Sequence, residues 1–232
     1  MSTIYLIRHG QASAKSENYD CLSALGEEQS QLLAPHLKSC VGNLKIIVRG
    51  DMQRHLQTAA HFENLLETGS AEIRINPGWN EYDHQDILAA YNPQLRTPAG
   101  IKAYLEANKL TKKEFKSVFL DAMKQWLDGN SSTTYAESWI QFKARVLSSF
   151  EDIRLNGNGD IVVFTSGGPI SLITSHLLGL PHEKFMNINW SLVNAGVTKI
   201  LVNSKTGHCT LSSLNEHSIF DVESTRNRIT YT

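Results

Sequence analysis

The chain has 232 residues, with 22 Lys and Arg against 23 Asp and Glu and a formal net charge of −1. That length fits one α/β domain with a small insertion, because single domains of this class reach about 200–250 residues. The balanced charge creates no broad field to attract nucleic acid or anionic lipid, so any anion binding must be local. We therefore expect one domain over residues 1–232 and neither a nucleic-acid partner nor a membrane partner.

The cysteines and the apolar runs indicate the cell compartment. Cys21, Cys40 and Cys209 are odd in number, far apart and without metal-ligand spacing, which is typical of a reducing environment. Residues 1–7 are too short for the apolar core of a signal peptide, and no later run approaches the ~18 residues of a membrane span. We expect a cytoplasmic protein without a bound metal, while its oligomeric state is left open.

The first half of the chain predicts two strands, each followed by a helix. The apolar run Ile4 to Ile7 is typical of a strand covered on both faces, and it ends at Arg8-His9-Gly10. After a loop over residues 11–20, Ser23 is placed to cap a helix that ends near Cys40. Leu44 to Val48 predicts the second strand, and a helical pattern follows Asp51 as far as Leu66.

The second half begins with short helical pieces over residues 77–134, which we interpret as an insertion over the sheet's edge. A long helix over 135–155 follows, then a turn at 156–159 and a strand from Ile161 to Thr165. Ser166-Gly167-Gly168 ends that strand, and Ile170 to Leu178 is helical. Strand-like stretches at 197–202 and 209–214 complete a predicted three-layer α/β/α fold with a mostly parallel sheet.

Several polar groups are predicted at the strand ends. A histidine in the place of His9 can titrate near neutral pH, accept a phosphoryl group or donate a hydrogen bond, and the guanidinium of Arg8 beside it suits phosphate. Arg54 lies at a helix start, where the macrodipole disfavours a cation by about 0.3–1 kcal/mol unless an anion is bound there. It could also be an ordinary solvated residue. Because ligands bind beyond the carboxyl ends of parallel strands, Arg8, His9, Arg54 and the Ser166-Gly167 turn are expected around one pocket.

Five blocks of sequence point to a known family. They are Arg8-His9-Gly10, the helix start Leu22 to Gln29, the stretch Asp51 to Ala59, the acidic Glu81, and Val163 to Ile170. In this order they resemble the histidine phosphatase superfamily, which has the phosphoglycerate mutase-like fold. The family's second block is Asp-Leu-x-Arg-Ala-x-Gln-Thr-Ala and its last is Val-Val-Ser-His-Gly-Gly-Val-Ile. The resemblance covers residues 4 to 170, most of the chain.

The resemblance implies a phosphomonoesterase with a helical cap insertion over the active site. His9 would become phosphorylated, Glu81 would be the general acid, and Arg8 and Arg54 would bind the phosphoryl group with Ser166 and Gly167. Asp83 is the nearest rival to Glu81. No metal or other cofactor is expected, and the partners would be a small phosphomonoester and inorganic phosphate.

One position departs from the family pattern, because Ser166 stands where the family has a second histidine. A hydroxyl there can still donate one hydrogen bond to a phosphate oxygen. His84 or His55 could replace the missing imidazole, although either could equally be an ordinary surface or core residue. Ser166 could also be only the N-cap of the following helix.

Other functions compete with a phosphatase. The chain could be a catalytically weak protein that binds a phosphorylated ligand or acts as a scaffold, yet a binder needs neither His9 nor Glu81. A phosphoglycerate mutase is less favoured, because the residues after Gly10 differ from the mutase pattern. A serine hydrolase that uses Ser166 is least favoured, because Phe164 occupies the first glycine position of the Gly-x-Ser-x-Gly elbow.

Overall fold

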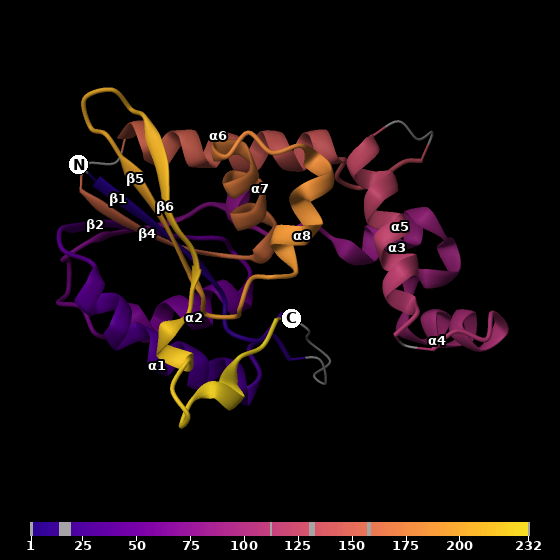
Figure 1. The fold of residues 1–232 in the computed structure, drawn as a ribbon. Helices are drawn as coiled ribbons and strands as arrows, with labels where there is room; N and C mark the ends of the chain where they lie inside the picture. The colour runs from indigo at the N-terminus through magenta and orange to yellow at the C-terminus, as the bar shows by residue number, and fades with distance from the viewer. Residues whose placement is uncertain (1, 14–19, 112, 130–132, 157–158, 232) are drawn as a thin grey trace. The chain divides into compact units, whose positions relative to one another are not determined.

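The computed structural model describes residues 2–13, 20–111, 113–129, 133–156 and 159–231, and its centre is a six-stranded sheet in the order β3-β2-β4-β1-β5-β6 (Figure 1). Strands β3, β2, β4 and β1 run parallel, whereas β5 is antiparallel to both β1 and β6. The sheet is therefore mostly parallel, and the predicted α/β class is confirmed. The strands are β1 (Ser2–Arg8), β2 (Leu44–Arg49), β3 (Glu72–Ile75), β4 (Asp160–Thr165), β5 (Val197–Val202) and β6 (Cys209–Glu216).

The strand register brings three polar strand ends together. Arg8 at the end of β1 pairs with Thr165 at the end of β4, and Arg49 at the end of β2 pairs with Phe164. The segments that follow these strands therefore leave the sheet at the same edge. This edge is where the crevice of an open α/β sheet forms.

Helices lie on both sides of the sheet (Figure 1). Helices α1 (Ala24–Cys40) and α2 (Gln53–Glu63) lie on one side, and α7 (Gly167–Leu177) lies on the other. The chain also forms the long helix α6 (Trp139–Asn156) and the short helix α8 (Phe185–Asn189). Burial of each large side chain contributes about 1.5–3 kcal/mol. The core on the α1 and α2 side contains Tyr5, Ile7, Leu33, Leu37, Ile47, Phe62, Val162 and Phe164.

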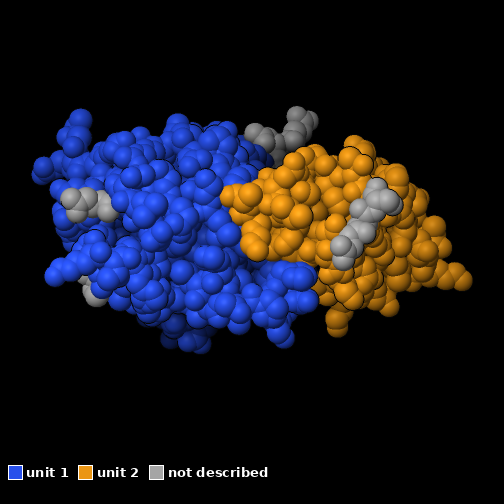
Figure 2. Space-filling model, turned by 90° about the horizontal axis from the view of Figure 1, so that it is seen from above, with its two compact units in different colours: residues 1–81, 145–232 blue, residues 82–144 orange. Residues whose placement is uncertain are grey.

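Two compact units divide the chain: residues 1–81 with 145–232, and residues 82–144 (Figure 2). The second unit contains α3 (His84–Tyr91), α4 (Pro98–Ala107), α5 (Phe115–Asp128) and the start of α6. It has its own aromatic core, in which the ring centroids of Trp126 lie 5.3 Å from those of Tyr82 and Trp139. The predicted insertion over 77–134 lies mostly within this unit, and its place over the active site stays a prediction.

The structure differs from the sequence-based expectations in detail. The edge strand β3 was not expected, because it has only four residues and Ile73 and Ile75 are exposed on it. Helix α7 begins at Gly167, three residues before the predicted start at Ile170, and α6 begins at Trp139. Residues 14–19 of the predicted loop and 157–158 of the predicted turn lie outside the described residues. No helix in the described ranges is long and apolar enough to cross a bilayer.

Candidate active site

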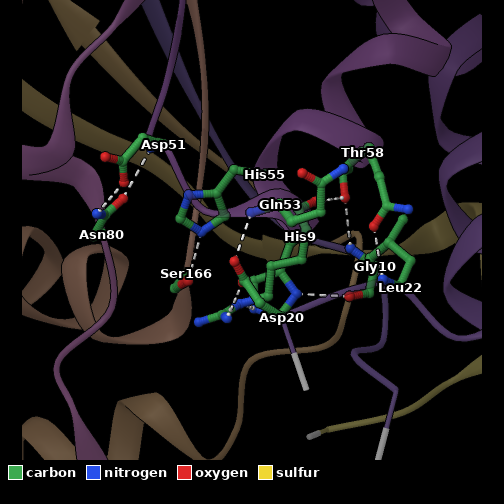
Figure 3. A network of polar contacts seen from close by, with 12 residues as sticks. His9, Gly10, Asp20, Leu22, Asp51, Gln53, His55, Thr58, Asn80 and Ser166 are labelled. Carbon is green, nitrogen blue, oxygen red and sulfur yellow. Dashed lines mark hydrogen bonds and ion pairs between the residues drawn. The ribbon is translucent and has the colours of Figure 1, made fainter. Parts of the chain in front are cut away.

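His9 lies at the centre of the polar edge and is fixed from several directions (Figure 3). Its side chain is buried, with Nδ1 2.6 Å from the Gly10 carbonyl oxygen and Nε2 3.1 Å from Nε of Arg54. Its backbone carbonyl accepts a hydrogen bond from the side-chain amide (Nδ2) of Asn194 at 3.1 Å. Because a carbonyl can only accept, Nδ1 carries the proton, and Nε2 then accepts from Arg54. The ring is thus the Nδ1–H tautomer, with its lone pair at Nε2.

The surroundings of His9 favour the neutral ring. Burial lowers the pKa of His9 well below its ordinary value, and the charges of Arg54, His55 and Arg8 act in the same direction. The hydrogen bond to Gly10 opposes this shift only in part. An imidazole in this state keeps a lone pair available, as a nucleophile requires.

Arg54 lies in the first turn of α2, where the structure shows an anion from the chain itself. Met52 occupies the N-cap position without a side-chain capping bond. The Asp20 carboxylate accepts a hydrogen bond from the Gln53 amide at 2.8 Å and lies 2.6 Å from Nη1 of Arg54. The predicted conflict between Arg54 and the helix dipole is therefore relieved by Asp20, which sequence reasoning did not single out. Asp20 precedes α1 with no periodic pattern around it.

The loop after His9 is tied to both neighbouring helices. The Gly10 amide donates to the Thr58 hydroxyl at 3.1 Å, and Thr58 in turn donates to the Arg54 carbonyl at 2.8 Å. A Cβ at Gly10 would lie 2.4 Å from the Gly26 carbonyl oxygen, so the chain passes α1 too closely for any side chain. The Leu22 amide donates to Gln57 at 2.8 Å. These contacts therefore connect three of the sequence blocks: Arg8 to Gly10, Leu22 to Gln29 and Asp51 to Ala59.

Arg8 is held by the carboxyl-terminal part of the chain. Its Nη1 donates to the carbonyl oxygens of Leu192 and Tyr231, the second at 3.1 Å. A Cβ at Gly167 would lie 3.7 Å from Nε of Arg8, so the first residue of α7 packs against this guanidinium. The predicted neighbours Arg8 and Gly167 are thus adjacent in the structure.

Ser166 occupies the N-cap position of α7, but its side chain makes no capping hydrogen bond. Its Oγ lies instead 2.7 Å from Nε2 of His55, and both residues are fully buried. The His55 ring centroid is 5.7 Å from that of His9. The alternative in which Ser166 only caps the helix is therefore wrong for its side chain, and His55 lies inside the polar cluster.

Glu81 reaches the same helix start. Its two carboxylate oxygens lie 3.0 and 3.2 Å from the amide nitrogen of Gly168. Two side chains hold the segment before it in place. The Arg145 guanidinium donates to the carbonyls of Gly78, Asn80 and Glu81, and the Thr165 hydroxyl donates to the carbonyl of Trp79 at 2.5 Å. The dipole of α7 favours a carboxylate at this position.

The rivals named from the sequence have other positions. The Asp83 carboxylate caps α3, accepting from the amides of Gln85 and Asp86 at 2.9 and 3.1 Å. His84 is the first residue of α3, in the second compact unit. The six predicted residues instead lie in the first unit, connected through contacts of His9 with Arg54, of Arg8 with Gly167 and of Glu81 with Gly168.

Comparison with known proteins identifies the family of the chain. The histidine phosphatase superfamily (branch 1) matches residues 4–95 and 102–217, and the chain belongs to this family. No curated protein sequence matches the chain.

Solved structures share the fold. A mycobacterial glucosyl-3-phosphoglycerate phosphatase in complex with VO3 is 19% identical and superposes with a TM-score of 0.66 over 94% of this chain and 100% of that one. A phosphoserine phosphatase from Entamoeba histolytica, in complex with 3-phosphoglyceric acid, is 21% identical, with a TM-score of 0.62 over 94% and 99%. The alpha-ribazole phosphatase of Shigella flexneri is 20% identical, with a TM-score of 0.60 over 92% and 96%. The predicted phosphoglycerate mutase-like fold is confirmed.

Proposed function

We propose that this protein hydrolyses a small phosphomonoester through a phosphohistidine intermediate on His9. The observation that carries the proposal is the neutral, buried His9 ring with its lone pair at Nε2, 3.1 Å from the Arg54 guanidinium. A phosphoryl acceptor needs that lone pair, and a phosphoryl group needs the cation beside it. The family assignment and the phosphatases among the solved structures support the same reaction class.

In the first step, Nε2 of His9 forms a bond to phosphorus while the bond from phosphorus to the ester oxygen breaks. Arg8 and Arg54 neutralise the charge on the phosphoryl oxygens, and Arg54 exchanges its bond to Nε2 for one to phosphate. Glu81, which must be protonated when the phosphomonoester binds, gives its proton to the leaving alcohol. In the second step, water attacks phosphorus, its proton returns to Glu81, and His9 leaves with its lone pair restored. The scheme consumes one water and releases an alcohol and inorganic phosphate.

Labelling tests the proposal directly. The protein is mixed briefly with a 32P-labelled phosphomonoester, quenched in base and digested, and the label is located by mass spectrometry. We expect acid-labile label on His9 and loss of both label and turnover in His9→Ala. Undiminished turnover by His9→Ala would refute the proposal. A panel of phosphorylated metabolites, assayed with the active wild type, identifies the substrate that it prefers.

A further inference from the structure

His55 and Ser166 form a buried pair that the reaction scheme above does not use. Their side chains lie 2.7 Å apart, neither is accessible to solvent, and they come from helix α2 and from the end of β4. Figure 3 shows the pair beside His9. The His55 ring centroid lies only 5.7 Å from that of His9, the candidate nucleophile. A buried imidazole at this distance requires an explanation beyond packing.

The environment of the ring determines which atom carries its proton. Burial, with the charges of Arg54 and Arg49, lowers the pKa of His55 well below its ordinary value, so the ring is neutral. Nδ1 has no hydrogen-bond partner among the residues that the structure describes. An unpaired buried N–H is rarer than an unpaired buried acceptor, so the proton belongs on Nε2. Nε2–H therefore donates to Oγ of Ser166.

The backbone leaves room for this arrangement. A Cβ at Gly50 would lie 2.4 Å from Nδ1 of His55, so glycine at that position lets the ring lie against the chain. With its oxygen accepting from His55, Ser166 must direct its own hydroxyl hydrogen elsewhere, and it makes no capping bond to α7. The next residue, Gly167, packs against Arg8.

We propose that His55 is a positioning residue that holds the Ser166 hydroxyl as a hydrogen-bond donor to the phosphoryl group. This inference rests on the proposed function and deepens it, because it names the group that takes the place of the family's second histidine. The sequence blocks are consistent with such an exchange: this chain has His55 where the family pattern has alanine, and Ser166 where it has histidine.

Four variants test the pair. Ser166→Ala should lower kcat/KM about 10²-fold, as expected for loss of one preorganised donor, and His55→Ala should cause a similar loss. The kcat/KM of the double variant should be no lower than that of the less active single variant, because the two side chains act as a unit. His55→Gln should recover much of the loss, since its amide can still donate to Ser166. His61→Gln is the matched control on α2, because His61 bonds Glu27 instead.

Two measurements separate a positioning role from a purely structural one. The inhibition constant of vanadate should rise in parallel for Ser166→Ala and His55→Ala, and 15N NMR should show the Nε2–H tautomer for His55. Unchanged kinetics and vanadate binding in Ser166→Ala would overturn the inference. Fully multiplicative losses in the double variant would overturn it as well, as would phosphoryl label on Ser166 instead of His9.

The outcome can be distinguished from failure of the proposed function. If the wild type neither turns over phosphomonoesters nor labels on His9, the proposed function fails. Binding of inorganic phosphate, measured by calorimetry on the same variants, then still decides whether His55 and Ser166 act together on an anion. If the wild type is active and the two single variants match it, only the inference about the pair fails.

Discussion

Nε of Arg54 and Nε2 of His9 are 3.1 Å apart, so the guanidinium contacts the atom that would attack phosphorus. The same Arg54 binds the Asp20 carboxylate through Nη1. One side chain therefore connects the candidate nucleophile to a negative charge at the start of α2.

Arg54→Lys is expected to reduce kcat/KM by about 10²–10³-fold while the protein stays folded. A lysine keeps the charge but lacks the planar fork that can bind Asp20 and a phosphoryl oxygen together. Steady-state kinetics with a matched Tm measurement checks this result. Activity near that of the wild type would show that Arg54 only stabilises the start of α2 through its pair with Asp20.

Asp20→Asn is expected to strengthen inhibition by vanadate by up to about fivefold. The amide can still accept the Gln53 bond, but it no longer competes with an anion for Arg54, and a partly exposed ion pair contributes about 1 kcal/mol or less. Competitive inhibition at low ionic strength measures the effect. Asp152→Asn, which removes an exposed charge on α6, is the control; weaker inhibition in Asp20→Asn would mean that Asp20 mainly orients Arg54.

Glu81→Gln should slow the hydrolysis of alkyl phosphates far more than that of nitrophenyl phosphate. A nitrophenolate leaves without protonation, whereas an alkoxide needs an acid. Glutamine can still accept from the Gly168 amide, so the start of α7 keeps its partner. Asp83→Asn should leave the ratio of the two rates unchanged, and an equal loss with both substrates in Glu81→Gln would assign the proton to another group.

Folding stability should decrease on acidification from about pH 7 to pH 5.5. His9 and His55 have pKa values well below the ordinary 6.5 in the folded state, so the unfolded chain binds more protons over this range. Below pH ~6.5, each neutral ring therefore raises the free energy of unfolding by about 1.4 kcal/mol for every unit by which the pH rises.

Urea unfolding at several pH values measures that slope. His9→Gln and His55→Gln should each flatten it, because glutamine does not titrate. His61→Gln is the matched control, because His61 is partly exposed and contacts Glu27 instead of the buried cluster. A free energy of unfolding that stays constant between pH 7 and pH 5.5 would contradict the prediction.

The sequence predicts the part of the site that depends on strand ends. Apolar runs before Arg8 and Ser166 specify where β1 and β4 stop, and parallel pairing then brings both ends to one edge. The contact between His55 and Ser166 spans 111 positions and depends on the side-chain direction of a helical residue. The sequence contains only a weak signal for a role of His55 in the site, namely that it directly follows Arg54. Asp20 carried no periodic signal at all.

The fold was predictable to a similar degree. Ser23 was expected to cap α1 and does accept a hydrogen bond from the Gly26 amide at 3.0 Å. The strand β3 was missed because its exposed edge carries no buried periodic pattern. Such an element depends on its pairing with β2 more than on its own sequence.

The connection of Arg8 to Tyr231 has a consequence for how the protein is made. Strand β1 is synthesised long before its partners β4 and β5, which begin at residues 160 and 197, and Arg8 reaches its second carbonyl partner only at residue 231. A chain still emerging from the ribosome therefore holds β1 without either neighbour. The contacts of Arg8 within the candidate site are therefore complete only after residue 231 has been translated.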